Sequence, residues 1–180
     1  MLHTLLNGDA VGQHLQCDLS SYHLSLSRLD RGRLYPLAST ELNAPATSPP
    51  ITRLRIICDL LPQWPMEMSV SGMSLTPSRR ERPAIGCITV ADVLSTVHTC
   101  LQTAITHDEW GRLSDAQETD IARAYTRRYK AFAAVESQVK REGVKRVDYL
   151  LKKIYFQGLT WLQPEAGVER VKLLVGIHST

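Results

Sequence analysis

The chain has 180 residues, of which 43% are hydrophobic and 22% are charged, and its formal net charge is +3. This size and composition suit a globular protein and exclude a chain that is disordered throughout. No apolar run approaches the roughly 20 residues that cross a bilayer, and the N-terminus lacks the basic region of a secretory signal. We therefore expect an intracellular protein, cytoplasmic or nuclear, without a membrane span.

Four cysteines, at positions 17, 58, 87 and 100, are spread along the chain without a Cys-x-x-Cys pair. In an intracellular protein of this size such a set is typical of free and mostly buried thiols. The alternative is a tetrahedral zinc site, which would need ligands from distant segments to converge, because no paired ligand spacing is present. We expect no metal and no cofactor.

The first fifty residues alternate short apolar pieces with turn signals, and we expect them to run extended. Leu15, Cys17 and Leu19 alternate with polar residues, which predicts a strand over residues 13–19. Residues 22–26 continue the alternation more weakly. Residues 43–50 are rich in proline, which cannot join the interior of a sheet, so they predict a connector that runs over the surface.

The next segment carries the clearest fold signal, a strand pair that leads into a helix. Alternating apolar residues predict strands over residues 52–60 and 66–70. The polar and aperiodic residues 71–86 predict a mobile loop. Apolar residues at helical spacing then predict a helix over residues 90–101, and we expect this helix to lay its apolar face across a sheet.

Helix starts are predicted by residues that can cap a helix N-terminus, each followed three residues later by a carboxylate or an amide. The first starts the helix over residues 90–101, the second starts a short helix near Trp110, and the third starts a long helix from about residue 115 to residue 141. Gly143 is the predicted C-cap of the long helix. The capping pairs are Thr89 with Asp92, Thr106 with Glu109, and Ser114 with Gln117.

Extended patterns return in the last third of the chain. Residues 144–151, 153–157 and 170–177 are rich in β-branched and aromatic residues, and each segment is predicted to be a strand. Strands on both sides of a helical block indicate an α+β fold. We expect a mainly antiparallel sheet with a helix pair inserted between N-terminal and C-terminal strands, partly β-grasp-like. We expect one domain over residues 1–180, with its α+β core at residues 51–177.

Several short motifs occur together along the chain. As a set they resemble an uncharacterised domain family of mushroom-forming fungi, the basidiomycetes, which has no assigned function. The resemblance covers most of the chain and implies a fungal source and a single domain, but it transfers no catalytic residue. The motifs are Ala44-Pro-Ala-Thr-Ser-Pro-Pro50, Leu54-Arg-Ile with the later Trp64-Pro65, Ile88-Thr-Val-Ala-Asp-Val-Leu94, Glu109-Trp110, Gly143-Val-Lys-Arg-Val-Asp-Tyr-Leu-Leu151 and Phe156-Gln-Gly-Leu159.

The candidate titrating groups of an enzymatic site are His98, His107 and Cys87. His107 precedes two carboxylates, a cluster that suits general base chemistry, although the same residues suit the first turn of a helix. His98 lies on the apolar face of its predicted helix, which favours a partly buried core histidine. The chain has no nucleophile elbow, phosphate-binding loop or zinc-helix motif. A small enzyme with its site near residues 71–86 is therefore an alternative and not the leading hypothesis.

Two features suggest binding surfaces. Trp64, Met66 and Met68 concentrate large apolar side chains; core filling is the commoner role of such a cluster, but exposed methionines and a tryptophan would mark an interaction surface. Residues 123–153 hold ten Lys and Arg against three carboxylates, a formal charge of +7, and the rest of the chain carries −4. Arg128 falls within an apolar helix stripe, and we expect its head to reach solvent. The basic residues expected to bind a partner are Arg123, Arg127, Lys130, Lys145 and Arg146.

The leading hypothesis is a protein-interaction domain without catalytic activity. It binds a protein partner or self-associates, through an exposed sheet edge or through the Trp64 segment. For residues 123–153 the first hypothesis is a solvated face that binds no ligand, and the second is a face that binds an acidic protein partner. Nucleic-acid binding through this face ranks last. Nucleic-acid sites usually interleave exposed aromatic residues among the basic ones, and of Tyr125, Tyr129 and Tyr149 we expect Tyr125 to be buried.

Overall fold

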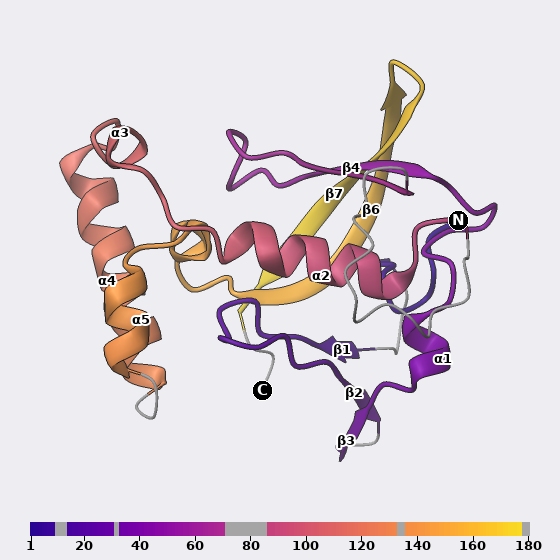
Figure 1. Ribbon diagram of the computed structural model, residues 1–180, viewed down its shortest axis with the longest axis horizontal. Helices are drawn as coiled ribbons and strands as arrows, with labels where there is room; N and C mark the ends of the chain where they lie inside the picture. Colours follow the sequence, from indigo (N-terminus) through magenta and orange to yellow (C-terminus); the bar gives the residue numbers. More distant parts are fainter. Residues whose placement is uncertain (10–13, 31–32, 71–85, 133–135, 178–180) are drawn as a thin grey trace.

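The computed structural model describes residues 1–9, 14–30, 33–70, 86–132 and 136–177 (Figure 1). Two sheets and several helices make up this part of the chain. The predicted loop at residues 71–86 lies outside the described residues except for Gly86. In chain order the elements are β1 (His14–Gln16), β2 (Ser27–Asp30), β3 (Arg33–Pro36), α1 (Ser39–Leu42), β4 (Arg53–Ile57), β5 (Met66–Ser69), α2 (Val90–Leu101), α3 (His107–Trp110), α4 (Asp115–Ala131), α5 (Glu136–Glu142), the 3₁₀ helix η4 (Arg146–Leu150), β6 (Tyr155–Glu165) and β7 (Val168–Gly176).

The larger sheet has the strand order β5-β4-β7-β6. Two antiparallel hairpins, β4–β5 and β6–β7, are joined at the centre by the parallel pairing of β4 with β7. Leu54 and Ile56 of β4 are buried while their neighbours in the strand are not, as the alternating sequence predicts. The α+β class and the β-grasp-like arrangement are therefore confirmed, with mostly antiparallel strands and the helices between N-terminal and C-terminal strands.

Helix α2 crosses the larger sheet and closes the core (Figure 1). Its N-terminus is the predicted capping box: the Thr89 hydroxyl accepts from the Asp92 N–H at 3.2 Å, and the Asp92 carboxylate accepts from the Thr89 N–H at 3.0 Å. Both residues are buried, so these bonds satisfy backbone donors that water cannot reach. The apolar face of the helix is buried through Val93, Leu94 and Val97.

The N-terminal part differs from the prediction in two respects. Its three-stranded sheet has the order β1-β2-β3, so residues 22–26 form no strand and the chain turns back at residues 27–36 instead. The proline-rich connector also does not run over the surface along its whole length, because Ala46 and Thr47 are buried. The Ala46 N–H donates to Ile88 O at 2.8 Å, and its carbonyl accepts from the His3 N–H at 2.8 Å. The extended backbone is thus held from both sides.

A glycine in β6 allows the N-terminal segment to pack against that strand. Gly158 has φ +115°, and a Cβ at this position would lie 2.4 Å from the Cα of Gly8. The Gly8 N–H donates to Leu159 O at 3.0 Å across this close approach. Only a residue without a side chain fits both the backbone angle and the contact.

The predicted helix from residue 115 to residue 141 is two helices, so that prediction is wrong. Helix α4 ends at Ala131, and Phe132 leaves the helical region with φ −110° and ψ 55°. Helix α5 lies beside α4, since the Tyr125 hydroxyl donates to Lys140 O at 3.3 Å and Lys140 Nζ lies 4.8 Å from the centre of the Tyr129 ring. Figure 1 shows α3, α4 and α5 together at one end of the molecule.

The predicted strand at residues 144–151 is also wrong, because the segment forms η4. Asp148 accepts a hydrogen bond from the Lys145 N–H at 2.8 Å, which caps a helical turn. It also binds Arg128, twenty residues earlier in the chain. These partners hold a sequence rich in β-branched residues in a turn, because a buried carboxylate must keep its hydrogen bonds.

Candidate binding groove

The three candidate catalytic residues do not form one site. Cys87 is buried just before α2, where burial raises the pKa of its thiol. His98 is half-buried near the other end of α2 and donates from Nε2 to Ser21 O at 2.9 Å. His107 is exposed on α3. No hydrogen bond or ion pair joins any two of them within the described ranges, and no cluster of metal-binding side chains occurs there.

The side chains of Trp64, Met66 and Met68 form no exposed surface, which corrects their assignment as binding residues. Trp64, Met66 and Met68 are all buried in the core. The Trp64 Nε1–H donates to Glu109 Oε1 at 2.7 Å. Hydrogen bonds from the Thr106 backbone and from Trp64 hold the pKa of the Glu109 carboxyl below its usual value. This tryptophan therefore anchors α3 to the sheet.

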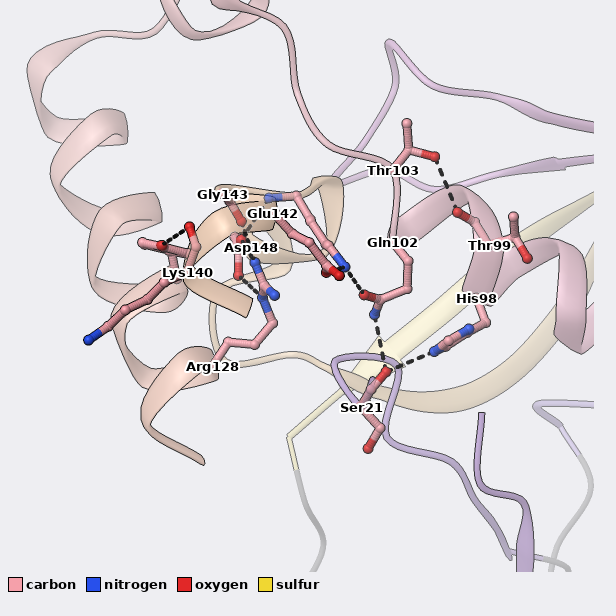
Figure 2. A network of polar contacts seen from close by, with 12 residues as sticks. Ser21, His98, Thr99, Gln102, Thr103, Arg128, Lys140, Glu142, Gly143 and Asp148 are labelled. Carbon is pink, nitrogen blue, oxygen red and sulfur yellow. Dashed lines mark hydrogen bonds and ion pairs between the residues drawn. The ribbon is translucent and has the colours of Figure 1, made fainter. Parts of the chain in front are cut away.

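Arg128 lies inside the protein and not in solvent, contrary to the prediction. Its Nε and Nη2 donate to the two oxygens of Asp148 at 2.9 and 2.8 Å, and Nη2 also donates to Gly143 O at 2.9 Å. The two side chains are only 4% and 2% exposed. Figure 2 shows them pointing toward each other between α4 and η4. Such a fork-to-carboxylate pair holds the helical end of the molecule together.

Lys145 and Arg146, which the sequence suggested as binding residues, also have internal partners. Lys145 is buried, and its Nζ lies 2.7 Å from Glu142 Oε2 and 3.0 Å from Gln102 Oε1. Gln102 in turn donates to Ser21 O at 3.3 Å, in the network of Figure 2. The Arg146 guanidinium lies 4.9 Å from the centre of the Trp64 ring. Both cations therefore join elements of the fold.

Four exposed cations line one groove of about 680 Å³. Arg123 and Arg127 contribute from α4, and Lys152 and Lys153 contribute from the segment after η4. Lys130 is exposed on α4 but does not line the groove. We call this feature the cationic groove; its lining residues are Leu60, Asp120, Arg123, Arg127, Tyr149, Leu150, Leu151, Lys152, Lys153 and Ile177.

The apolar part of the groove is contributed by segments far apart in the chain. Leu60, Leu151 and Ile177 are 40%, 39% and 62% exposed, although all three are aliphatic. They come from the β4–β5 connection, the end of η4 and the end of β7. Exposed apolar side chains that gather in one hollow are typical of a binding site.

The charged part of the groove is strongly positive. Four cations stand against one carboxylate, a formal charge of +3, which equals the net charge of the whole chain. Asp120 lies 3.6 Å from Arg123 in an exposed pair that contributes little energy. Arg127 donates to Leu151 O at 3.3 Å. No ion pair involves Lys152 or Lys153 within the described residues.

A protein-family model described as a family of unknown function, DUF6699, matches residues 15–171. This range includes every lining residue of the cationic groove except Ile177. The chain belongs to the DUF6699 family. The DUF6699 chain has no match among the curated proteins or the solved structures. None of the helices in its described part is long and apolar enough to span a membrane.

Sequence reasoning identified part of this groove and missed the rest. The sequence predicts that Arg123 and Arg127 bind a partner, and both residues line the groove. Lys152 and Lys153 belong to the basic segment but were not assigned a role. Leu60, Leu151 and Ile177 carried no local signal, because a groove assembled from three distant segments appears only when the chain is folded.

Proposed function

We propose that this DUF6699 chain is a protein-interaction domain without catalytic activity, and that its cationic groove binds an acidic segment of a partner protein. The observation that carries the proposal is the combination of four cations with three exposed aliphatic side chains in one hollow. Electrostatic complementarity would steer an acidic segment to the groove, and burial of apolar side chains would retain it.

An acidic protein segment suits this groove better than a nucleic acid does. Single-stranded nucleic acids stack their bases on exposed aromatic rings. Tyr125 and Tyr129 lie against each other with ring centres 5.3 Å apart, and cationic groups lie near both rings. Tyr149 lines the groove but packs edge to face on Trp64 at 4.8 Å. The aliphatic lining offers a phosphate backbone nothing to contact.

Fluorescence anisotropy tests the proposal with a labelled peptide, Ser-Glu-Glu-Glu-Leu-Leu-Leu-Ser. The groove variant is Arg127→Glu with Lys153→Glu, and we expect it to bind the peptide at least about tenfold more weakly than the wild type. The matched control is Arg112→Glu with Lys130→Glu, which makes the same charge change at exposed residues outside the groove. Equal loss of affinity in both variants would refute the proposal. Tighter binding of a generic single-stranded DNA would favour the nucleic-acid alternative.

Self-association through a sheet edge stays part of the proposal, and its best candidate is β3. This strand is at the edge of the N-terminal sheet and is exposed along its whole length, including Leu34 and Tyr35. An open edge with apolar side chains can pair with a second copy. Sizing with light scattering should show a dimer that Leu34→Lys converts to a monomer; a monomeric wild type at high concentration would contradict it.

An intracellular location, in the cytoplasm or the nucleus of a fungal cell, is also proposed. The free thiols Cys17, Cys58 and Cys87, all buried, and the half-buried Cys100 support a reducing compartment, where disulfides are rare. Localisation of the tagged protein in fungal cells would check this.

A further inference from the structure

The cationic groove has two chemically different sides. Every lining residue from α4 is charged, namely Asp120, Arg123 and Arg127. Every apolar lining residue comes from elsewhere: the β4–β5 connection, η4 with the residue after it, and the end of β7. A ligand that fills the groove therefore meets only charged side chains on the α4 side, and apolar side chains together with Lys152 and Lys153 on the other side. A ligand with one acidic face and one mainly apolar face fits these two sides.

The spacing of the two arginines suggests the backbone conformation of such a ligand. Arg123 and Arg127 are four residues apart on α4, so they lie on one helix face, about 6 Å apart along the axis. In an extended peptide, side chains two residues apart point the same way and are about 6.6 Å apart. Carboxylates at alternate positions of an extended segment thus match the two guanidinium groups.

The same alternation places the remaining side chains on the apolar side. The residues between the carboxylates point in the opposite direction, toward Leu60, Leu151 and Ile177. Lys152 and Lys153 follow Leu151 directly and can bind a further carboxylate. A segment of alternating acidic and apolar residues satisfies both sides of the groove at once.

The backbone of Leu151 indicates that its position in the groove is imposed by the fold. This residue has φ +57° and ψ −102°, a conformation that a leucine rarely adopts. The Leu151 N–H donates to Asp148 O at 3.2 Å, and its carbonyl accepts from Arg127, so both sides of the residue are fixed. Strained residues held by their surroundings cluster at binding sites. Here the strain keeps an aliphatic side chain 39% exposed in the groove.

The geometry points to a specific ligand class: the cationic groove selects an extended acidic segment in which glutamate or aspartate alternates with large apolar residues. This inference rests on the proposed function and adds the residue pattern and the conformation of the partner segment. Arg123 and Arg127 bind the acidic side chains of the segment, and Leu60, Leu151 and Ile177 contact its apolar side chains.

Two labelled peptides of identical composition test the inference: the alternating Ser-Glu-Leu-Glu-Leu-Glu-Leu-Ser and the blocked Ser-Glu-Glu-Glu-Leu-Leu-Leu-Ser. We expect the wild type to bind the alternating peptide at least about tenfold more tightly, because only this peptide presents charge and hydrocarbon on opposite faces. Equal affinities would overturn the inference and leave the proposed function intact. Binding of neither peptide would refute the proposed function itself.

Variants of the apolar side identify the residues responsible. Leu60→Ser with Ile177→Ser should reduce the preference for the alternating peptide to near one, because it weakens binding of that peptide more than binding of the blocked peptide. Leu34→Ser is the control, since Leu34 is 55% exposed, between the values of Leu60 and Ile177, but lies on β3, and this variant should keep the full preference. Leu151→Gly should lose the preference without lowering the urea midpoint, because glycine adopts this φ freely. Retained preference in both groove variants would overturn the assignment.

Discussion

Substituting Arg128 by methionine removes the guanidinium that Asp148 binds but keeps much of the aliphatic volume of the side chain. Asp148 would then retain one described hydrogen bond, from the Lys145 N–H at 2.8 Å, while its carboxylate stays only 2% exposed. Leaving one member of a buried pair alone costs about 3–5 kcal/mol. For a chain of this length, that loss lowers the melting temperature by about 6–20 °C.

A double-mutant cycle separates the pair from the rest of the network. Asp148→Asn keeps an oxygen for the Lys145 N–H but removes the charge, and we expect the double variant to lose much less stability than the two single variants added together. Arg123→Met is the matched control, because its pair with Asp120 is 3.6 Å long and the two side chains are 70% and 56% exposed. It should cost less than about 1 kcal/mol.

Urea unfolding, followed by circular dichroism and by tryptophan fluorescence, measures these free energies. The slope of the free energy with urea should be the same in all variants, so that the midpoints report stability alone. If Arg128→Met costs no more than Arg123→Met, the pair is not the buried connection between α4 and η4 that we describe.

Three further predictions follow from other parts of the structure. Gly158→Ala should abolish folding, because its Cβ would lie 2.4 Å from the Cα of Gly8. Gly167 has φ +74° and open space around it, so Gly167→Ala should lower the free energy of unfolding by only about 1 kcal/mol. Soluble yield and circular dichroism compare the two variants. The free energy of unfolding should fall as the pH rises from about 9 to about 12. Burial raises the pKa of the Cys17 thiol from 9.0 to about 12, so over this range the thiol ionises in the unfolded chain but not in the folded one. In Cys17→Ala the urea midpoint should therefore decline less steeply with pH. Thr89→Ala should cost about 1–2 kcal/mol, because it removes a buried N-cap; a urea midpoint unchanged from wild type would contradict this.

Features determined by neighbouring residues could be predicted from the sequence. The capping pairs of α2, α3 and α4 depend on side chains three residues apart, and all are formed as expected. The strands β4 and β5 follow a period of two that is local in the same sense. The fold class follows from the order of these elements, so it could also be predicted from the sequence.

Features determined by distant residues could not be predicted from the sequence. Residues 144–151 have the composition of a strand, but Arg128 and the Lys145 N–H both bind Asp148 and hold the segment in a 3₁₀ turn. The parallel pairing of β4 with β7 joins segments more than a hundred residues apart. Likewise the sequence alone allows Trp64 either a core position or a place on an interaction surface, and in the fold Glu109 and Arg146 lie against its ring.

The cationic groove could be predicted from the sequence only in part. A concentration of positive charge in residues 123–153 was visible from composition alone. Which of these cations are exposed in the fold was not visible, because Arg128, Lys145 and Arg146 contact side chains from other segments of the chain, namely Asp148, Gln102 and Trp64. Only the fold thus distinguishes the cations that have internal partners from the exposed cations that line the groove.

Backbone amide NMR during titration with the alternating peptide tests the central claim most directly, because it locates the binding site without any substitution. We expect the largest shift changes at Leu60, at residues 120–127 and at residues 149–153, with little change in β3 and the N-terminal sheet. Changes centred on another surface, or small changes spread evenly over the molecule, would contradict the account of the cationic groove as the binding site of this DUF6699 chain.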